Sequence, residues 1–331
     1  MNRFLLIALL AAACGTADPK RSSNDDDARN AVLRSLAADL MTERYTAFRD
    51  AADTFAAAAN ECDTDAMKTH WWSTREPWKN TEIVWFGPVK EYPERLGPKI
   101  DDWPANERAV NELLDSTQDL SMESFAAMGS ATRGFPAIEI ILWTAADHPR
   151  ACAAVQGASA DLAANAELLL DAWTNRWTPS HSSGKSVLNE WVNQMGFTAQ
   201  NIRELKLGKP VGDYSDGEPQ PDLLESRLSG RSLADASNAL EGVRLVWAGV
   251  NDQGIRTLVP DESIQQQVDN LLAIAGDRLG SIPEPLEEAI VNEPEIVDYA
   301  QAPLRELQSV LQRDVATALN VTVTFNDSDG D

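Results

Sequence analysis

The 331-residue chain contains few histidines, cysteines and basic residues. It has three histidines and three cysteines, and its 28 lysines and arginines compare with 52 aspartates and glutamates, a formal net charge of −24. A nucleic-acid-binding protein needs a basic face, so this balance argues against nucleic acid as a partner. It also argues against peripheral binding to anionic lipid. An acidic surface suits a solvated, exported protein, but charge alone names no ligand.

The common hydrolase motifs are also missing. The chain has no G-x-S-x-G nucleophile elbow, and its histidines, at positions 70, 148 and 181, include no pair with the H-E-x-x-H spacing of a helical zinc site. The residues therefore do not indicate a conventional serine or zinc hydrolase.

The N-terminus has the features of a targeting signal. Arg3 precedes the apolar run Phe4–Leu10, which is too short to span a bilayer, and three alanines then lead into Cys14. Small residues directly before a cysteine resemble a bacterial lipobox. We therefore expect residues 1–13 to be a lipoprotein signal peptide and Cys14 to be lipidated. Ordinary cleavage near Ala13, which leaves an unmodified cysteine, is the alternative.

The segment after this cysteine is polar and lacks apolar periodicity. Residues 14–27 contain glycine, proline, serine and three consecutive aspartates, and this composition predicts a flexible tether. Gly15, directly after the cysteine, favours the outer membrane over the inner. The expected location is the cell envelope, with a lipid anchor in the membrane.

Most of the remaining chain has helical periodicity. Apolar residues recur near a 3.6-residue period in segments that predict helices over 28–60, 63–84, 106–120, 121–131, 136–145, 151–177, 186–207, 232–249, 261–279 and 294–319. Residues 86–104 hold four prolines and two glycines, which predicts an ordered loop. Residues 321–325 alternate like a short strand but have no clear partner. The predicted fold class is all-α.

One helix carries a lone carboxylate among apolar residues. Glu139 follows Gly134 and Pro136 within the stretch Arg133–Trp143. This stretch resembles the G-x-H-x-x-E signature of imelysin-like proteins, in which the histidine and glutamate share one helix face as two ligands of one metal would. Here Pro136 occupies the histidine position, as in a subset of the family.

Several other blocks resemble the family in the same order along the chain. They are Trp78–Glu82, Phe86–Pro88, Trp103–Pro104, Glu225–Gly242 and Asp314–Asp331. The resemblance implies two packed helical bundles with a site between them. Residues 208–221, rich in glycine and proline, are the best boundary, so we expect one bundle over 28–207 and the other over 208–331.

The resemblance also implies a function. It suggests an envelope lipoprotein that binds a metal, iron or zinc, or another small ligand between its bundles, in iron uptake or iron regulation. One alternative is a metal-dependent peptidase with Glu139 as general base on a metal-bound water, which the proline at position 136 argues against. The other is an adaptor whose helical faces bind another envelope protein.

The candidate site residues come from both predicted bundles. Apolar neighbours make it costly to bury Glu139 unpaired, so we expect Arg133 to hold it at the site, with a metal as a tentative further partner. A carboxylate that only stabilises its helix N-terminus is the alternative. Further candidates are the carboxylate of Glu82 and the polar side chains of Ser232, Asp235 and Asn238, which recur every three residues and so share a helix face. Ser232 is also a good helix N-cap.

Two cysteines remain if Cys14 carries lipid. In an oxidising compartment Cys62 and Cys152 are expected to form a disulfide, and imelysin-like proteins often have a cysteine at both places. Two buried free thiols are the alternative.

Overall fold

A computed structural model describes residues 19–324 of the protein. The predicted signal peptide and Cys14 lie outside these residues. Within them the chain forms helices and no strand, so the all-α prediction is confirmed. Residues 321–324 have no regular secondary structure; Asn193 donates to the Thr322 carbonyl at 2.9 Å and accepts from the Thr324 amide at 3.0 Å. A side-chain amide thus supplies the hydrogen bonds that a neighbouring strand would have made.

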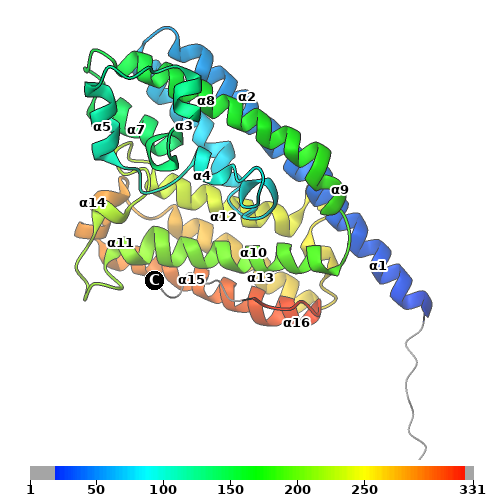
Figure 1. Ribbon diagram of the computed structural model, residues 1–331. Helices are drawn as coiled ribbons and strands as arrows, with labels where there is room; N and C mark the ends of the chain where they lie inside the picture. Colours follow the sequence, from blue (N-terminus) through cyan, green and yellow to red (C-terminus); the bar gives the residue numbers. More distant parts are fainter. Residues whose placement is uncertain (1–18, 325–331) are drawn as a thin grey trace, which may run out of the picture.

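The first group of helices forms the upper half of the molecule in Figure 1. Its longest members are α2 (Met41–Ala59), α3 (Thr64–Asn80) and α8 (Ala151–Ala172), and α2 packs against both of the others. The shorter members are α4 (Gly97–Ile100), α5 (Glu107–Asp115), α6 (Met122–Ala126) and α7 (Gly134–Thr144). Cys62 and Cys152 form a disulfide, with Cα atoms 5.4 Å apart, that links the end of α2 to the start of α8.

The second group lies below the first (Figure 1). It comprises α10 (Lys185–Asn201), α11 (Lys209–Val211), α12 (Ser232–Ala248), α13 (Glu262–Leu279), α14 (Leu286–Asn292), α15 (Pro294–Val310) and α16 (Ala316–Ala318). The helix α15 packs against both α10 and α13. One helical turn, α9 (Thr178–Ser180), lies between the two groups in the sequence. The π-helical turns at 173–177, 202–208 and 311–315 continue α8, α10 and α15, respectively.

The helix α10 lies in the predicted first half of the chain, but it packs against α12 and α15 of the second group. The glycine- and proline-rich stretch 208–221 contains α11, which contacts α14 and α15, so this stretch lies within the second group. The helix α1 (Pro19–Arg34) continues through a π-helical turn (Ser35–Leu40) into α2, so residues 19–27 of the predicted tether are helical.

The two groups meet where α12 packs against α3. Close approach depends on Gly242 of α12, because a Cβ there would lie 2.5 Å from the Asn80 carbonyl oxygen at the end of α3. Gly134, which begins α7, has φ of +68°, and a Cβ there would lie 2.3 Å from the Ile100 carbonyl oxygen. These glycines bring α3, α7, α12 and the predicted ordered loop 86–104 together.

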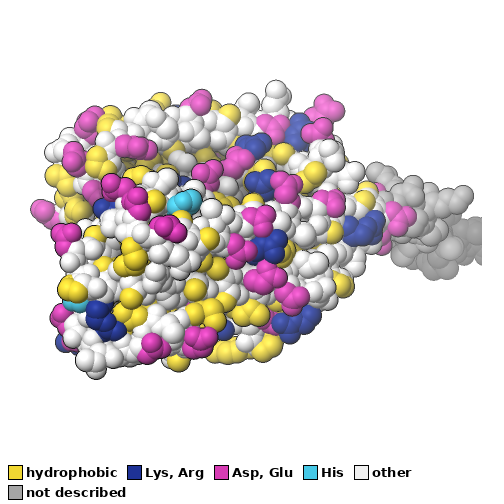
Figure 2. All heavy atoms as spheres, turned by 90° about the horizontal axis from the view of Figure 1, so that it is seen from above, with side chains coloured by type: hydrophobic (Ala, Val, Ile, Leu, Met, Phe, Trp, Pro, Cys, Tyr) yellow, Lys and Arg dark blue, Asp and Glu magenta, His cyan; other side chains and the backbone are white. Residues whose placement is uncertain are grey.

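The surface is mixed in charge. Figure 2 shows acidic side chains distributed over the face seen from above, with basic side chains among them. Among residues 19–324, no helix combines the length and the apolar character that a membrane crossing requires.

Candidate functional site

Charged side chains are buried where the two groups of helices meet. Arg75 and Lys79, both on α3, are 1% and 3% exposed, and Asp235 on α12 is 0% exposed. Burying a charge is costly unless it is paired. Seven side chains form these pairs, and we call them the charge network: Arg75, Lys79, Glu82, Asp101, Lys206, Glu225 and Asp235.

Arg75 lies at the centre of the charge network. Its Nε donates to Asp235 Oδ2 at 2.7 Å and its Nη1 donates to Asp101 Oδ1 at 3.0 Å. Trp78 Nε1 also donates to Asp101, at 2.9 Å. The guanidinium therefore joins the helix α12 to the ordered loop 86–104.

Two lysines and two carboxylates complete the charge network. Lys79 Nζ lies 3.0 Å from Glu82 and 2.9 Å from Glu225, and Lys206 Nζ lies 3.0 Å and 2.8 Å from the same two residues. Glu225 Oε2 contacts both lysines and lies 3.8 Å from Arg75. Each ammonium thus bridges the two carboxylates.

These contacts set the ionisation of the buried groups. Burial alone would raise the pKa of Glu225, but Lys206, Lys79 and Arg75 hold it well below its usual range. Burial alone would lower the pKa of Lys79, yet Asp101, Glu225 and Glu82 raise it well above the usual value. Glu225 and Lys79 are therefore both charged at neutral pH.

A cavity of about 430 Å³ opens onto the lysine end of the charge network. Lys79, Lys206, Glu82 and Glu225 line it. Its aromatic lining residues are Trp78, Trp85, Trp103 and Phe197. Residues from the first helical group, the ordered loop and α10 contribute to it, so this interface cavity lies between the two bundles. The predicted site residue Glu82 is part of its wall.

Glu139 lies beyond the other end of the charge network. Its Oε1 accepts a hydrogen bond from the Ser229 amide at 2.8 Å. The Ser229 hydroxyl donates to the Ser226 carbonyl at 3.0 Å, and the Ser226 hydroxyl donates to Asp235 Oδ2 at 2.7 Å. Burial raises the pKa of Glu139, with the hydrogen bond from Ser229 and the charge of Arg75 opposing. Two predicted residues, Glu139 and Asp235, are thus linked through the turn before α12.

The expected contact between Arg133 and Glu139 is wrong. Arg133 Nε donates to Asp161 Oδ2 of α8 at 2.8 Å, and its Nη2 contacts the other oxygen of that carboxylate. The Glu139 side chain on α7 points toward Ser229, in the turn before α12. Arg133 precedes α7, and its side chain extends to Asp161 on α8. Arg133 therefore ties α7 to α8 within the first bundle and does not reach the interface.

The remaining candidates have different placements. The Ser232 hydroxyl donates to the Glu225 carbonyl oxygen and also lies 2.5 Å from Glu287 Oε1. Arg231, not Ser232, is the N-cap residue of α12, because the serine is already in the first helical turn. Asn238 is half-buried on α12 and, within residues 19–324, is not joined to the charge network.

Sequence reasoning missed Arg75, Lys79, Asp101, Lys206 and Glu225. Charged residues on helices are usually solvated, so their presence alone gave no reason to expect burial. One signal was available: position 75 shares a helix face with Trp71 and Trp78, both buried. Nothing comparable marks Lys206 in the sequence.

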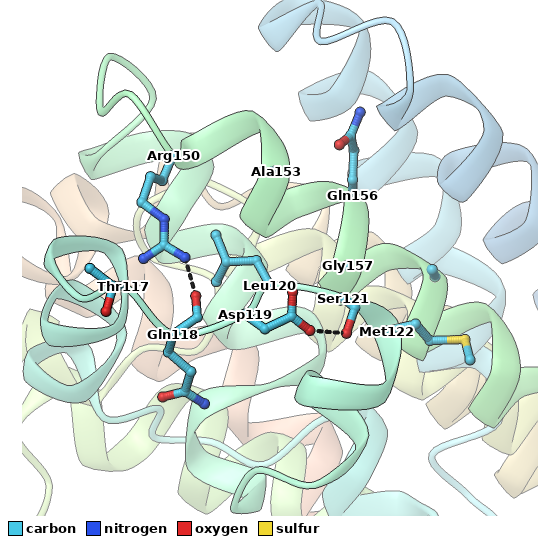
Figure 3. A pocket seen from close by; sticks show the side chains of 11 residues that line it. Thr117, Gln118, Asp119, Leu120, Ser121, Met122, Arg150, Ala153, Gln156 and Gly157 are labelled. Carbon is cyan, nitrogen blue, oxygen red and sulfur yellow. Dashed lines mark hydrogen bonds between the residues drawn. The ribbon is translucent and has the colours of Figure 1, made fainter.

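A second cavity, of about 610 Å³, lies between α8 and residues 117–122 (Figure 3). Arg150, the N-cap residue of α8, donates to the carbonyl oxygens of Leu113, Ser116 and Gln118. Asp119 accepts a hydrogen bond from Ser121. The charged groups of this cavity already hold the loop on α8, so the interface cavity is the better candidate site.

The hydrogen bond from Ser229 makes Glu139 a test of the link between the bundles. Glu139→Ala leaves a buried amide without an acceptor, and we expect it to lower the free energy of unfolding by about 2–3 kcal/mol. Glu139→Gln keeps an acceptor oxygen and should change it by less than about 1 kcal/mol. Urea unfolding at neutral pH measures the stability of both variants. An equal loss of stability in the two would show that the hydrogen-bond acceptor at position 139 does not stabilise the fold.

The comparisons with known proteins agree with this architecture. The Imelysin family profile matches residues 33–311. Iron-regulated protein A of Synechococcus elongatus is 24% identical over 297 residues, which cover 82% of this chain and 79% of the relative. The crystal structure of an imelysin-like protein from Psychrobacter arcticum superposes with a TM-score of 0.79 at 17% identity, covering 91% of this chain and 98% of that one. Because the family match extends over most of the sequence, the chain belongs to the imelysin family.

Proposed function

We propose that the protein binds a small organic ligand in the interface cavity and serves an iron-related process in the cell envelope. The observation that carries this proposal is the interface cavity itself. Its volume of about 430 Å³ is in the range of small-molecule sites, and it combines apolar aromatic walls with a few polar groups that converge from different elements.

The iron-related part rests on kinship. A relative that aligns with most of this chain is named iron-regulated protein A. The envelope location and the lipid anchor at Cys14 rest on the N-terminal sequence, where a short apolar run and small residues precede the cysteine. A tethered binding protein of this kind would hold its ligand outside the cytoplasm.

A resident metal ion does not fit the residues at the predicted position. Glu139 faces a backbone amide and the positive charge of Arg75, and neither ligates a cation. Both oxygens of Glu82 contact lysine ammonium groups. Among the described residues, no group of three or more His, Cys, Asp and Glu is arranged to hold a metal ion. Iron would therefore enter this proposal as part of a bound complex, and no step is derived through a protein-bound metal.

Ligand binding with a blocked cavity tests the proposal. Asn201 lines the interface cavity, and Asn201→Trp should fill part of it without removing a charged group. Ser186→Trp, exposed at the start of the same helix, is the matched control. A panel of small organic acids, neutral metabolites and ferric chelates would be screened by thermal shift, since a ligand at a hundred times its Kd stabilises the folded state by about 2.7 kcal/mol.

We expect at least one compound class to stabilise the wild type and the control but not Asn201→Trp. Stabilisation that persists in Asn201→Trp would place binding elsewhere. A panel without any stabilising compound would contradict the proposal.

A further inference from the structure

The charge network contains one carboxylate more than its cations require. Arg75, Lys79 and Lys206 supply three positive charges, and the carboxylates paired with them are Asp101, Glu225, Asp235 and Glu82. Arg231, the other cation near Asp235, is also shared with Glu76 at 3.9 Å. Three carboxylates are enough to balance the three buried cations.

Of the two carboxylates that both lysines contact, Glu82 has fewer cation partners than Glu225. Each of its oxygens contacts one lysine, whereas one oxygen of Glu225 lies near Lys79, Lys206 and Arg75 together. Glu82 also lies outside regular helix, in the turn that follows α3. Moving it away from the lysines would leave Glu225 in place and open both ammonium groups to the interface cavity.

The same cavity has aromatic walls beside these lysines. Trp85 is 38% exposed, although large aromatic side chains are normally buried. Trp103 and Phe197 line the interface cavity with it. Aromatic rings favour stacked or edge-to-face contacts with another ring, and ammonium groups form their strongest hydrogen bonds with anionic oxygens.

We infer that the ligand of the interface cavity is an aromatic carboxylate, whose carboxylate replaces that of Glu82 between Lys79 and Lys206 while its ring contacts the aromatic walls. This inference rests on the proposed function, because it names the ligand class of the same cavity. The protein glutamate acts as an internal competitor, so it neutralises the lysines when the cavity is empty of ligand.

Calorimetric titration with two probes and two comparison compounds tests this inference. Benzoate and salicylate carry both the ring and the charge. Cyclohexanecarboxylate keeps the charge without an aromatic ring, and benzamide keeps the ring without the charge. Each is titrated into the full mature chain, into Glu82→Gln and into Glu112→Gln, which makes the same charge change at an exposed position on α5.

We expect benzoate or salicylate to bind, and Glu82→Gln to lower its Kd about tenfold because the competing carboxylate is gone. Glu112→Gln should leave that Kd unchanged, and both comparison compounds should bind about tenfold or more weakly. Circular dichroism of each variant checks that it is folded.

The other outcomes overturn the inference in distinguishable ways. An unchanged or higher Kd in Glu82→Gln would show that Glu82 does not compete with the ligand. Binding of neutral compounds but not of aromatic carboxylates, lost in Asn201→Trp, would reject this ligand class and leave the proposed function standing. No binding by any of the four compounds would reject this ligand class, whereas the proposed function is rejected only if the wider panel of the thermal-shift screen also contains no ligand.

Discussion

Replacement of Arg75 by methionine is expected to lower the free energy of unfolding by about 3–5 kcal/mol. The guanidinium is 1% exposed and hydrogen-bonds to Asp235 and Asp101, which are also buried. Methionine is similar in length, but it leaves the buried Asp235 without its closest cation and leaves Asp101 with Lys79 as its remaining cation. The cost arises from this lost charge pairing more than from lost packing.

Chemical denaturation of Arg75→Met measures this loss, with Arg49→Met as its control. Arg49 on α2 also pairs with carboxylates, but at a side-chain exposure of 28%, and surface pairs contribute about 1 kcal/mol or less. A second change, Asp235→Leu, should recover part of the stability lost in Arg75→Met because it removes one unpaired charge. A loss in Arg75→Met no larger than in Arg49→Met would contradict the assigned role.

The hydrogen bond between Arg75 and Asp235 supports both the fold and the candidate site. Arg75 belongs to the first group of helices and Asp235 to the second, so their hydrogen bond crosses the interface between them. Removing this hydrogen bond is expected to weaken the packing between the two groups and so to disturb the interface cavity that lies between them. Ligand affinity and stability should therefore fall in parallel in Arg75→Met.

Removal of the disulfide has the second large expected effect. Cys62 and Cys152 are separated by 90 residues, and closing a loop of this length lowers the entropy of the unfolded chain enough to stabilise the fold by about 4–5 kcal/mol. The double variant Cys62→Ala with Cys152→Ala should lose about this amount. Urea unfolding monitored by tryptophan fluorescence measures it.

Reduction of the wild type provides the matched comparison. Unfolding in excess dithiothreitol should give the same midpoint as the double variant, because both remove the same constraint. The double variant should keep its midpoint when the reductant is added. A double variant as stable as the oxidised wild type would show that α2 and α8 hold this end of the bundle without the covalent link.

Helical periodicity was sufficient to predict the fold class, the long helices and the ordered loop. Apolar residues at a 3.6-residue period mark which face of a helix is buried, and the prolines and glycines of residues 86–104 exclude a long helix there. The same information does not say which helix covers that face. For this reason periodicity could not predict that α10 packs against α12 and α15.

The candidate site was predicted only in part, for a related reason. Glu82, Glu139, Ser232 and Asp235 were recognisable because they interrupt apolar or small-residue patterns or recur at helical spacing, and the structure places them at or near the interface between the bundles. Arg133 was assigned a partner by proximity in sequence. It instead pairs with Asp161, which lies on another helix.

The sequence by itself therefore determined the all-α fold class, the long helices, the excess of acidic residues and several residues near the interface. Only the tertiary structure decided which charges are buried and which partners neutralise them. The pairs Arg75–Asp235 and Lys79–Glu225 join residues far apart in the chain, and such pairs form only when the packing of α3 against α12 excludes water from both partners. Burial of a charge is a property of that packing, and for this reason the charge network could not be predicted from the order of residues.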